Sequence, residues 1–114
     1  MKRWLALLTG VFLVLSQPAF SQQAWYEGGT LQKGTVDDWN RATQENQLAT
    51  SADFIASLNA IPDLSTIKDQ EIMNDVYKKS VDLRQCINLT IKVDSPPDQP
   101  IAQFVVQCTI LKQK

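Results

Sequence analysis

The sequence predicts a small, mainly helical domain that is exported and closed by one disulfide bond, and its last third is open to two interpretations. Three observations predict it: an amino-terminal segment with the features of a secretion leader, two stretches with the spacing of amphipathic helices, and a pair of cysteines in the last third of the chain. The 114 residues allow one domain. A core of this size gives only marginal stability unless a cross-link or another constraint adds to it.

Residues 1–21 have the pattern of a signal peptide that is cleaved before Gln22. Two basic residues open it, an apolar run follows at 4–15, and Ala19 and Ser21 place small side chains at the −3 and −1 positions. The apolar run is shorter than the roughly 20 residues that span a bilayer. No cysteine follows it for lipid attachment. We therefore expect a protein of the periplasm or the medium, without stable membrane association after cleavage.

The mature chain, residues 22–114, has 93 residues and a mild net charge. Without Lys2 and Arg3, nine basic residues remain against twelve acidic ones, a net charge of −3. No basic patch is visible, so nucleic acid and anionic membrane surfaces are poor candidates for partners.

Cys86 and Cys108 are predicted to form a structural disulfide. An exported chain meets an oxidising compartment, and an even count of cysteines favours pairing. Closing the 21-residue loop between them is expected to stabilise the fold by roughly 3 kcal/mol. A redox pair or a metal site is the alternative. It is weakened by the absence of a C-x-x-C motif and of any histidine.

The mature chain is expected to open with an irregular arm, residues 22–34, followed by a helix. Thr35 can cap that helix, and two carboxylates follow it near the positive end of the helix dipole. No proline or glycine interrupts residues 35–60, and Pro62 ends the element. The wholly polar turn 43–47 is expected to face water or a partner. The apolar spacing predicts a buried face with Leu48, Ala52, Ile55 and Leu58 or Asn59.

A second helix is expected to begin near Ser65 or Thr66. Its predicted buried face advances in steps of three and four, through Ile72, Val76, Ser80, Leu83 and Ile87.

The last third of the chain fits two templates. Residues 87–93 alternate apolar and polar side chains, which is typical of a strand, and a turn rich in proline follows. Residues 101–111 offer a helical stripe and an equally long strand face; these are Ile101, Phe104, Val105, Cys108 and Leu111 for the helix, and Ala102, Phe104, Val106, Cys108 and Ile110 for the strand. Asp98 or Gln99 before Pro100 suits a helix start. The cysteine pair is compatible with either a helical or a strand hairpin, and local pattern alone favours the hairpin.

The segment GGTLQKGTVDDWNRATQENQLATSADFIA resembles the opening of a family of small secreted bacterial proteins, which share GGTL followed by LAT-AD. The CIN at 86–88 and the IAQFVVQCTIL at 101–111 resemble the two cysteine-bearing segments of that family. The resemblance implies a helix at each segment and carries no activity with it. It favours an all-α domain of about three helices over 35–114, with an α+β fold and a β-hairpin at 87–111 as the alternative. The plan is also similar, in size and architecture only, to the periplasmic acid-stress chaperones of the HdeA type.

Catalysis is not expected. The absence of histidine removes the commonest general base and most catalytic zinc sites, so no metal or other cofactor is predicted. Gly29 and Gly34 have the spacing of a phosphate loop, but Lys33 lies before the second glycine rather than after it. The carboxylates that could serve a hydrolase do not form a convincing pair; they are Asp37, Asp38, Glu45, Asp53, Asp69, Glu71, Asp75 and Asp82.

The aromatic residues Trp25, Tyr26 and Trp39 have two interpretations. They can fill a small core, which we favour at this chain length, or form a clamp for a partner protein. We expect a non-catalytic protein that binds other proteins, as a periplasmic stress chaperone. The alternative is an inhibitor or immunity-type protein that blocks an enzyme acting in the periplasm, and a carboxylate-dependent hydrolase ranks third.

Overall fold

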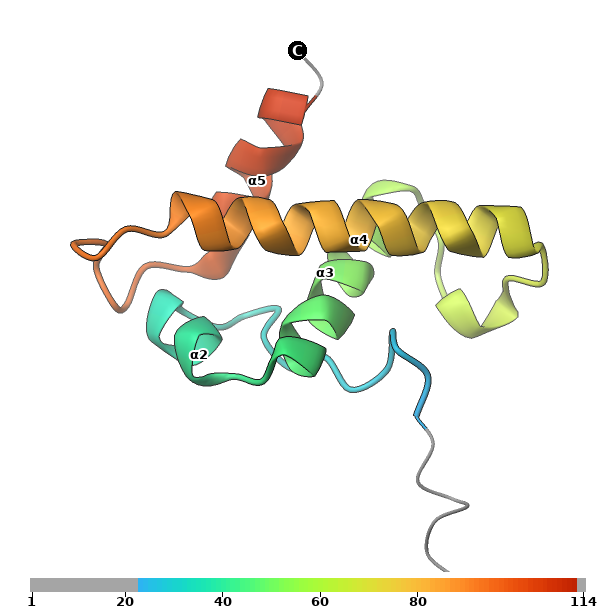
Figure 1. Cartoon of the computed structure of the whole chain (residues 1–114), viewed down its shortest axis with the longest axis horizontal. Coiled ribbons are helices and arrows are strands. Elements are labelled where there is room, and N and C mark those ends of the chain that lie inside the picture. Colours follow the sequence, from blue (N-terminus) through green and yellow to red (C-terminus); the bar gives the residue numbers. More distant parts are fainter. Residues whose placement is uncertain (1–22, 113–114) are drawn as a thin grey trace, which may run out of the picture.

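The computed structural model describes residues 23–112, and the predicted signal peptide lies outside them. Within that range the regular structure is helical and no strand is present (Figure 1). The elements are α2 (Val36–Arg41), α3 (Gln44–Leu58), the 3₁₀ helix η2 (Leu64–Thr66), α4 (Gln70–Thr90) and α5 (Ile101–Lys112). Cys86 and Cys108 form a disulfide, with their Cα atoms 6.0 Å apart. The predicted all-α fold with one disulfide is confirmed, and the alternative hairpin at 87–111 is wrong.

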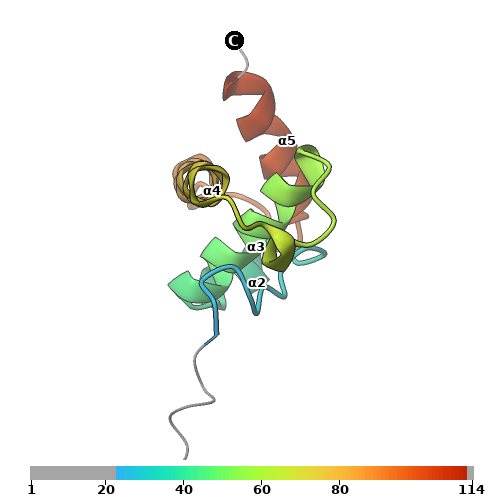
Figure 2. The same cartoon turned by 90° about the vertical axis from the view of Figure 1, so that its right-hand side faces the viewer.

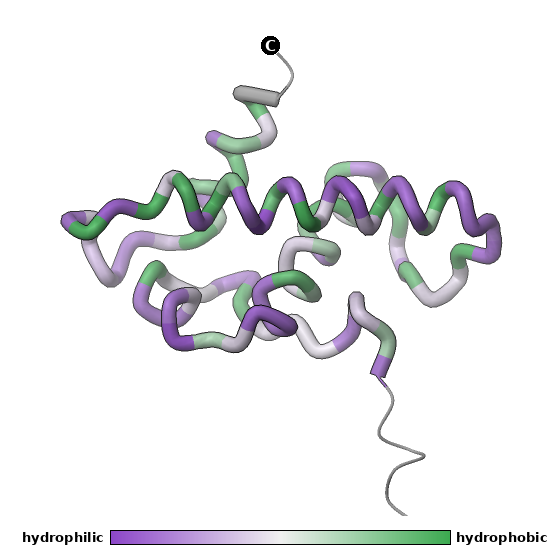
Figure 3. Tube along the Cα trace, in the orientation of Figure 1, coloured by the Kyte–Doolittle hydropathy of each residue, from purple (hydrophilic) through white to green (hydrophobic). Residues whose placement is uncertain are grey.

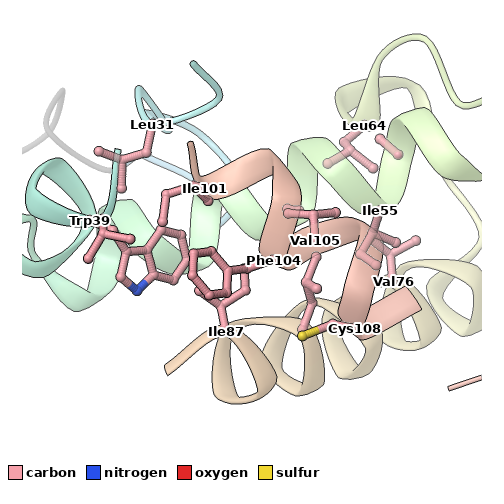
Figure 4. Close-up of a cluster of buried hydrophobic side chains, with 14 residues drawn as sticks. Leu31, Trp39, Ile55, Leu64, Val76, Ile87, Ile101, Phe104, Val105 and Cys108 are labelled. Carbon is pink, nitrogen blue, oxygen red and sulfur yellow. The ribbon is translucent and has the colours of Figure 1, made fainter. Parts of the chain in front are cut away.

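The longest helix, α4, forms one side of the molecule. Seen along its axis, α3 and α5 both lie on the same side of it (Figure 2). The disulfide links the last part of α4 to α5. The buried apolar side chains come from all four helices, from η2 and from the arm before α2. Trp39 and Ile101 lie at one end of this cluster and Leu64 at the other (Figure 4).

The predicted start of the first helix is confirmed at Thr35. The Thr35 hydroxyl accepts a hydrogen bond from the Asp38 amide at 3.2 Å, and the Asp38 carboxylate accepts one from the Thr35 amide at 3.0 Å. This is a capping box, which satisfies two amides that the first turn leaves without helical partners.

The unbroken helix expected over 35–60 is wrong, because the chain breaks before α3. Thr43 is extended and caps α3 by accepting a hydrogen bond from the Asn46 amide at 3.1 Å. The buried Gln47 side chain donates to the Trp39 carbonyl oxygen at 2.8 Å, at the end of α2. The polar turn is therefore not wholly at the surface, because its residue Gln47 joins α3 to the end of α2.

The start of α4 is also later than expected. Asp63 caps η2, and α4 begins at Gln70 behind Asp69, whose carboxylate accepts from the Glu71 amide at 2.9 Å. The predicted buried face holds from its second member onward, through Val76, Ser80, Leu83 and Ile87. Ile72 is the exception: it lies in the first turn of α4 and is 49 % exposed.

Residues 87–90 belong to α4, because Ile87 continues the buried face that Leu83 occupies one turn earlier. In α5 the buried residues are those of the helical stripe: Ile101, Phe104, Val105 and Cys108. The strand template is contradicted at Val106 and Ile110, which point outward. The helix starts at Ile101 itself, a little after the expected position.

The loop before α5 caps α2. The Val36 amide donates to the Gln99 carbonyl oxygen at 2.9 Å, and the Asp37 amide donates to that of Pro97 at 3.0 Å. The Ile101 amide donates to the Gly34 carbonyl oxygen at 2.9 Å. The beginnings of α2 and α5 are thus fastened together through backbone groups.

Candidate functional site

Trp39 is a core residue. Its side chain is fully buried, and the indole nitrogen donates a hydrogen bond of 2.8 Å to the side-chain oxygen of Asn88. It lies in the same apolar cluster as Ile87, Ile101 and Phe104 (Figure 4). An indole in this position presents no surface to a partner in the folded protein.

Trp25 and Tyr26 are half-buried and pack against the core from the arm. The Trp25 ring meets the Tyr26 ring edge to face at a centroid distance of 5.5 Å and the Tyr77 ring at 4.9 Å. Tyr77, on α4, is 45 % exposed. The helical spacing places Tyr77 beside the buried face of its helix. It does not reveal that the arm folds back so that Trp25 contacts Tyr77.

The arm is joined to α3 along one face of that helix. The Thr30 amide donates to the Asn46 side-chain oxygen, and the Asn46 amide group donates to the Thr30 hydroxyl, both at 2.9 Å. One turn further along α3, the Leu31 amide donates to the Thr50 hydroxyl at 3.2 Å. The GGTL segment and the LAT-AD segment thus contact each other.

Gly29 shows why this contact needs a glycine. A Cβ atom on Gly29 would lie 2.6 Å from the backbone nitrogen of Thr50 and 2.8 Å from the carbonyl carbon of Ala49. Contacts that short with backbone atoms force one of the two segments to move. This glycine is therefore explained by close packing and requires no phosphate ligand.

A polar groove of about 560 Å³ lies between the arm, α3 and the chain leading into η2. Three carboxylates line it, and each already accepts a hydrogen bond. Glu27 accepts from the Ala24 amide at 3.0 Å, Asp53 from the Gln32 side chain, and Asp63 from the Ser65 amide at 2.9 Å. Burial raises the pKa of Asp53 above its usual range, against the opposing effect of the Gln32 hydrogen bond.

Most of the remaining predicted carboxylates have a local structural role. Asp37 pairs with Arg41 at 3.1 Å and Asp75 with Lys79 at 2.9 Å, both one turn apart on an exposed helix face. Asp38 and Asp69 cap helices, Glu45 and Glu71 lie in first turns, and Asp82 lines the apolar groove between α3, α4 and α5. Among the described residues no group of three or more Cys, Asp or Glu side chains could hold a metal ion.

That apolar groove, about 420 Å³ in volume, is the second candidate site. Ile55 and Leu83 form its apolar lining with Leu58, and the disulfide residue Cys108 contributes to its wall. Asn59, Lys79, Asp82 and Thr109 also line the groove and supply its polar groups. Leu58, one of the two residues expected to complete the buried face of α3, is 57 % exposed. Its exposure follows from its place in the last turn of α3, which the helical spacing alone does not reveal.

Comparisons with protein-family models, with curated proteins and with solved structures found no match to this chain. In the part of the chain that the structure describes, no helix has both the length and the apolar character needed to cross a membrane.

Proposed function

We propose that this protein is a small, non-catalytic binding domain that recognises another protein through the apolar groove between α3, α4 and α5. The observation that carries the proposal is Leu58. A leucine that is 57 % exposed beside buried Ile55 and Leu83 leaves apolar surface open at a concave site. Apolar surface of this kind is the usual driving force for protein association.

The chemistry of the groove fits a protein ligand. A volume of about 420 Å³ accommodates one or two aliphatic or aromatic side chains of a partner. Lys79 and Asp82 add charged groups to the site, and an apolar centre with polar groups around it is the common composition of protein interfaces. An amphipathic helix or an extended segment can place side chains in such a groove.

The construction of the groove supports one specific partner over many clients. Promiscuous binding surfaces are typically rich in methionine or formed by loops that repack. Here the lining comes from three helices, includes no methionine, and includes a residue of the disulfide that fixes α5 on α4. An inhibitor or immunity-type role is therefore better supported than a broad stress chaperone.

The proposed location is the periplasm or the extracellular medium. The leader pattern at residues 1–21 and the disulfide both support it, because stable disulfides form in oxidising compartments. A catalytic role is less well supported, since all three carboxylates of the polar groove already accept hydrogen bonds from the protein itself.

The test compares Leu58→Glu with Leu89→Glu. Both replace an exposed leucine near the carboxyl end of a helix, so the charge change and the helix-dipole penalty are matched. The oxidised mature protein is immobilised and exposed to a periplasmic extract, and the captured proteins are identified. The affinity of the wild type and of each variant for the purified partner is then measured. We expect one stoichiometric partner, weakened at least about tenfold by Leu58→Glu and little changed by Leu89→Glu.

Two outcomes would contradict this proposal. Capture of many unrelated proteins, with suppressed client aggregation, would support the chaperone hypothesis instead. Equal binding by both variants would exclude the groove as the binding site.

A further inference from the structure

The outward face of α5 carries a continuous apolar stripe. Ala102, Val106 and Ile110 are spaced one turn apart and lie opposite the buried face of the helix. All three are exposed, Val106 by 55 % and Ile110 by 51 %. In Figure 3 the visible, coloured part of α5 is mostly hydrophobic. A helix that is apolar on both faces normally has both faces covered.

The stripe lies in a segment that has no charged side chain. Residues 101–111 contain no charged side chain, although 20 % of the whole chain is charged. Elsewhere, exposed Ile72 follows Glu71 and exposed Tyr77 precedes Lys78. The polar neighbours of the stripe are glutamines, whose amides both donate and accept hydrogen bonds.

We propose that this face pairs with the same face of a second copy of the chain, the two α5 helices running antiparallel about a two-fold axis near Val106. Two identical copies present identical charges to each other, so a self-complementary face must avoid like charges at its centre. The uncharged stripe meets this condition. The proposal does not depend on the groove described above, which lies toward Cys108 and Thr109 on α5.

The order of side-chain sizes along the stripe also suits an antiparallel pair. The small Ala102 of one copy lies opposite the larger Ile110 of the other, and Val106 lies opposite Val106, so that the two surfaces interdigitate. Gln103 and Gln107 lie on one flank of the stripe and are exposed. In this arrangement they face the glutamines of the other copy along one edge of the interface.

The fold presents this face rigidly and leaves room for a second copy. The disulfide fixes α5 against α4, and the carboxyl-terminal part of α5 stands clear of α4 (Figures 1 and 2). A 12-residue helix is about 18 Å long, so a pair of them covers less area than a standard permanent interface. The dimer is therefore reversible, and its population depends on protein concentration.

Sedimentation equilibrium of the oxidised mature protein, from low micromolar to millimolar concentration, tests the pairing. We expect the wild type to pass from monomer to dimer over this range. Val106→Glu places two carboxylates face to face at the two-fold axis and shifts the transition at least tenfold higher in concentration. Val93→Glu, which makes the same charge change at a fully exposed loop position, leaves the transition unchanged.

Mixing two variants tests whether the α5 face of one copy binds the same face of a second copy. Val106→Glu and Val106→Lys are each expected to stay monomeric, and a mixture of the two is expected to dimerise, because opposite charges then meet at the axis. Gln107→Glu, at an exposed position unimportant for folding, should weaken the dimer as well. A wild type that stays monomeric throughout the range, or a dimer that Val106→Glu does not weaken, would overturn the proposal. Leu58→Glu should leave the dimer intact, so failure of the groove proposal and failure of this one are distinguishable.

Discussion

The indole nitrogen of Trp39 donates a hydrogen bond to the side chain of Asn88, 49 positions further along the chain, and so joins α2 to the last part of α4. The tryptophan is buried in the core, whereas the asparagine lies at the surface. The indole nitrogen, the only polar atom of the Trp39 side chain, is therefore hydrogen-bonded although the ring is buried.

Removal of this partner should cost stability. We expect Asn88→Ala to lower the free energy of unfolding by about 1 kcal/mol, because the buried indole donor loses its partner and this loss exceeds the gain in helix propensity. Urea denaturation measures the change, and Gln85→Ala, at an exposed position on the same helix, is the control. Equal stability of the two variants would mean that water replaces Asn88 at no cost.

The contact between the arm and α3 should be intolerant of a single methyl group. Gly29→Ala is expected to destabilise the protein by about 1–3 kcal/mol, since its Cβ would meet backbone atoms at 2.6–2.8 Å. Gly34→Ala is the matched control: the nearest atoms to its Cβ lie at 3.2–3.4 Å, so a smaller loss is expected. The reverse order in urea denaturation would contradict this account of the GGTL segment.

The disulfide should contribute a large share of the total stability. Replacement of Cys86 and Cys108 by alanine is expected to lower the free energy of unfolding by about 3 kcal/mol. A reductant should produce a similar loss in the wild type and none in the double variant. Two free thiols in the purified, oxidised wild type would show that the bond does not form.

The two carboxylates with shifted pKa values should respond to acid in opposite directions. Burial raises the folded-state pKa of Asp53 above its usual value of 3.8, so the folded state gains stability as the pH falls from neutral through that pKa. Hydrogen bonds from Ser65 lower the pKa of Asp63, so its contribution is present above pH 3.8 and is lost as the pH falls through the lowered value.

Thermal midpoints of two asparagine variants measure this difference. At neutral pH, Asp53→Asn should match or exceed the wild type, because it removes a half-buried charge, whereas Asp63→Asn should fall below it. Both differences should shrink in acid. Differences of the same sign that do not change with pH would show that the variants act through packing alone.

Local signals were sufficient to predict several elements from the sequence. The Thr35 cap with Asp38 three residues later, the buried face from Val76 to Ile87, and the cysteine pair depend on spacing within one element or on the compartment. The helical stripe of α5 was visible but could not be separated from a strand by periodicity alone. What decides between them is packing of Phe104 and Cys108 against α4, a contact between distant segments.

The errors share a physical cause: distant contacts overrule weak local preferences. The break before Thr43 depends on the bond from Gln47 to the Trp39 carbonyl oxygen, and neither residue forbids a continuous helix. The candidate sites were hidden for the same reason. The groove beside Leu58 is completed by residues of α4 and α5, and the need for a glycine at position 29 comes from the close approach of Thr50.

The position of α5 has a consequence for the timing of folding. Four buried residues, from Ile101 to Cys108, follow the rest of the buried core in the sequence and are therefore synthesised after it. The covalent link that holds them cannot form before residue 108 is made and meets an oxidant. In a reducing environment the core therefore lacks the cross-link between Cys86 and Cys108. If the protein is exported as proposed, the chain passes the secretion channel without this bond, and the bond then forms in the oxidising compartment.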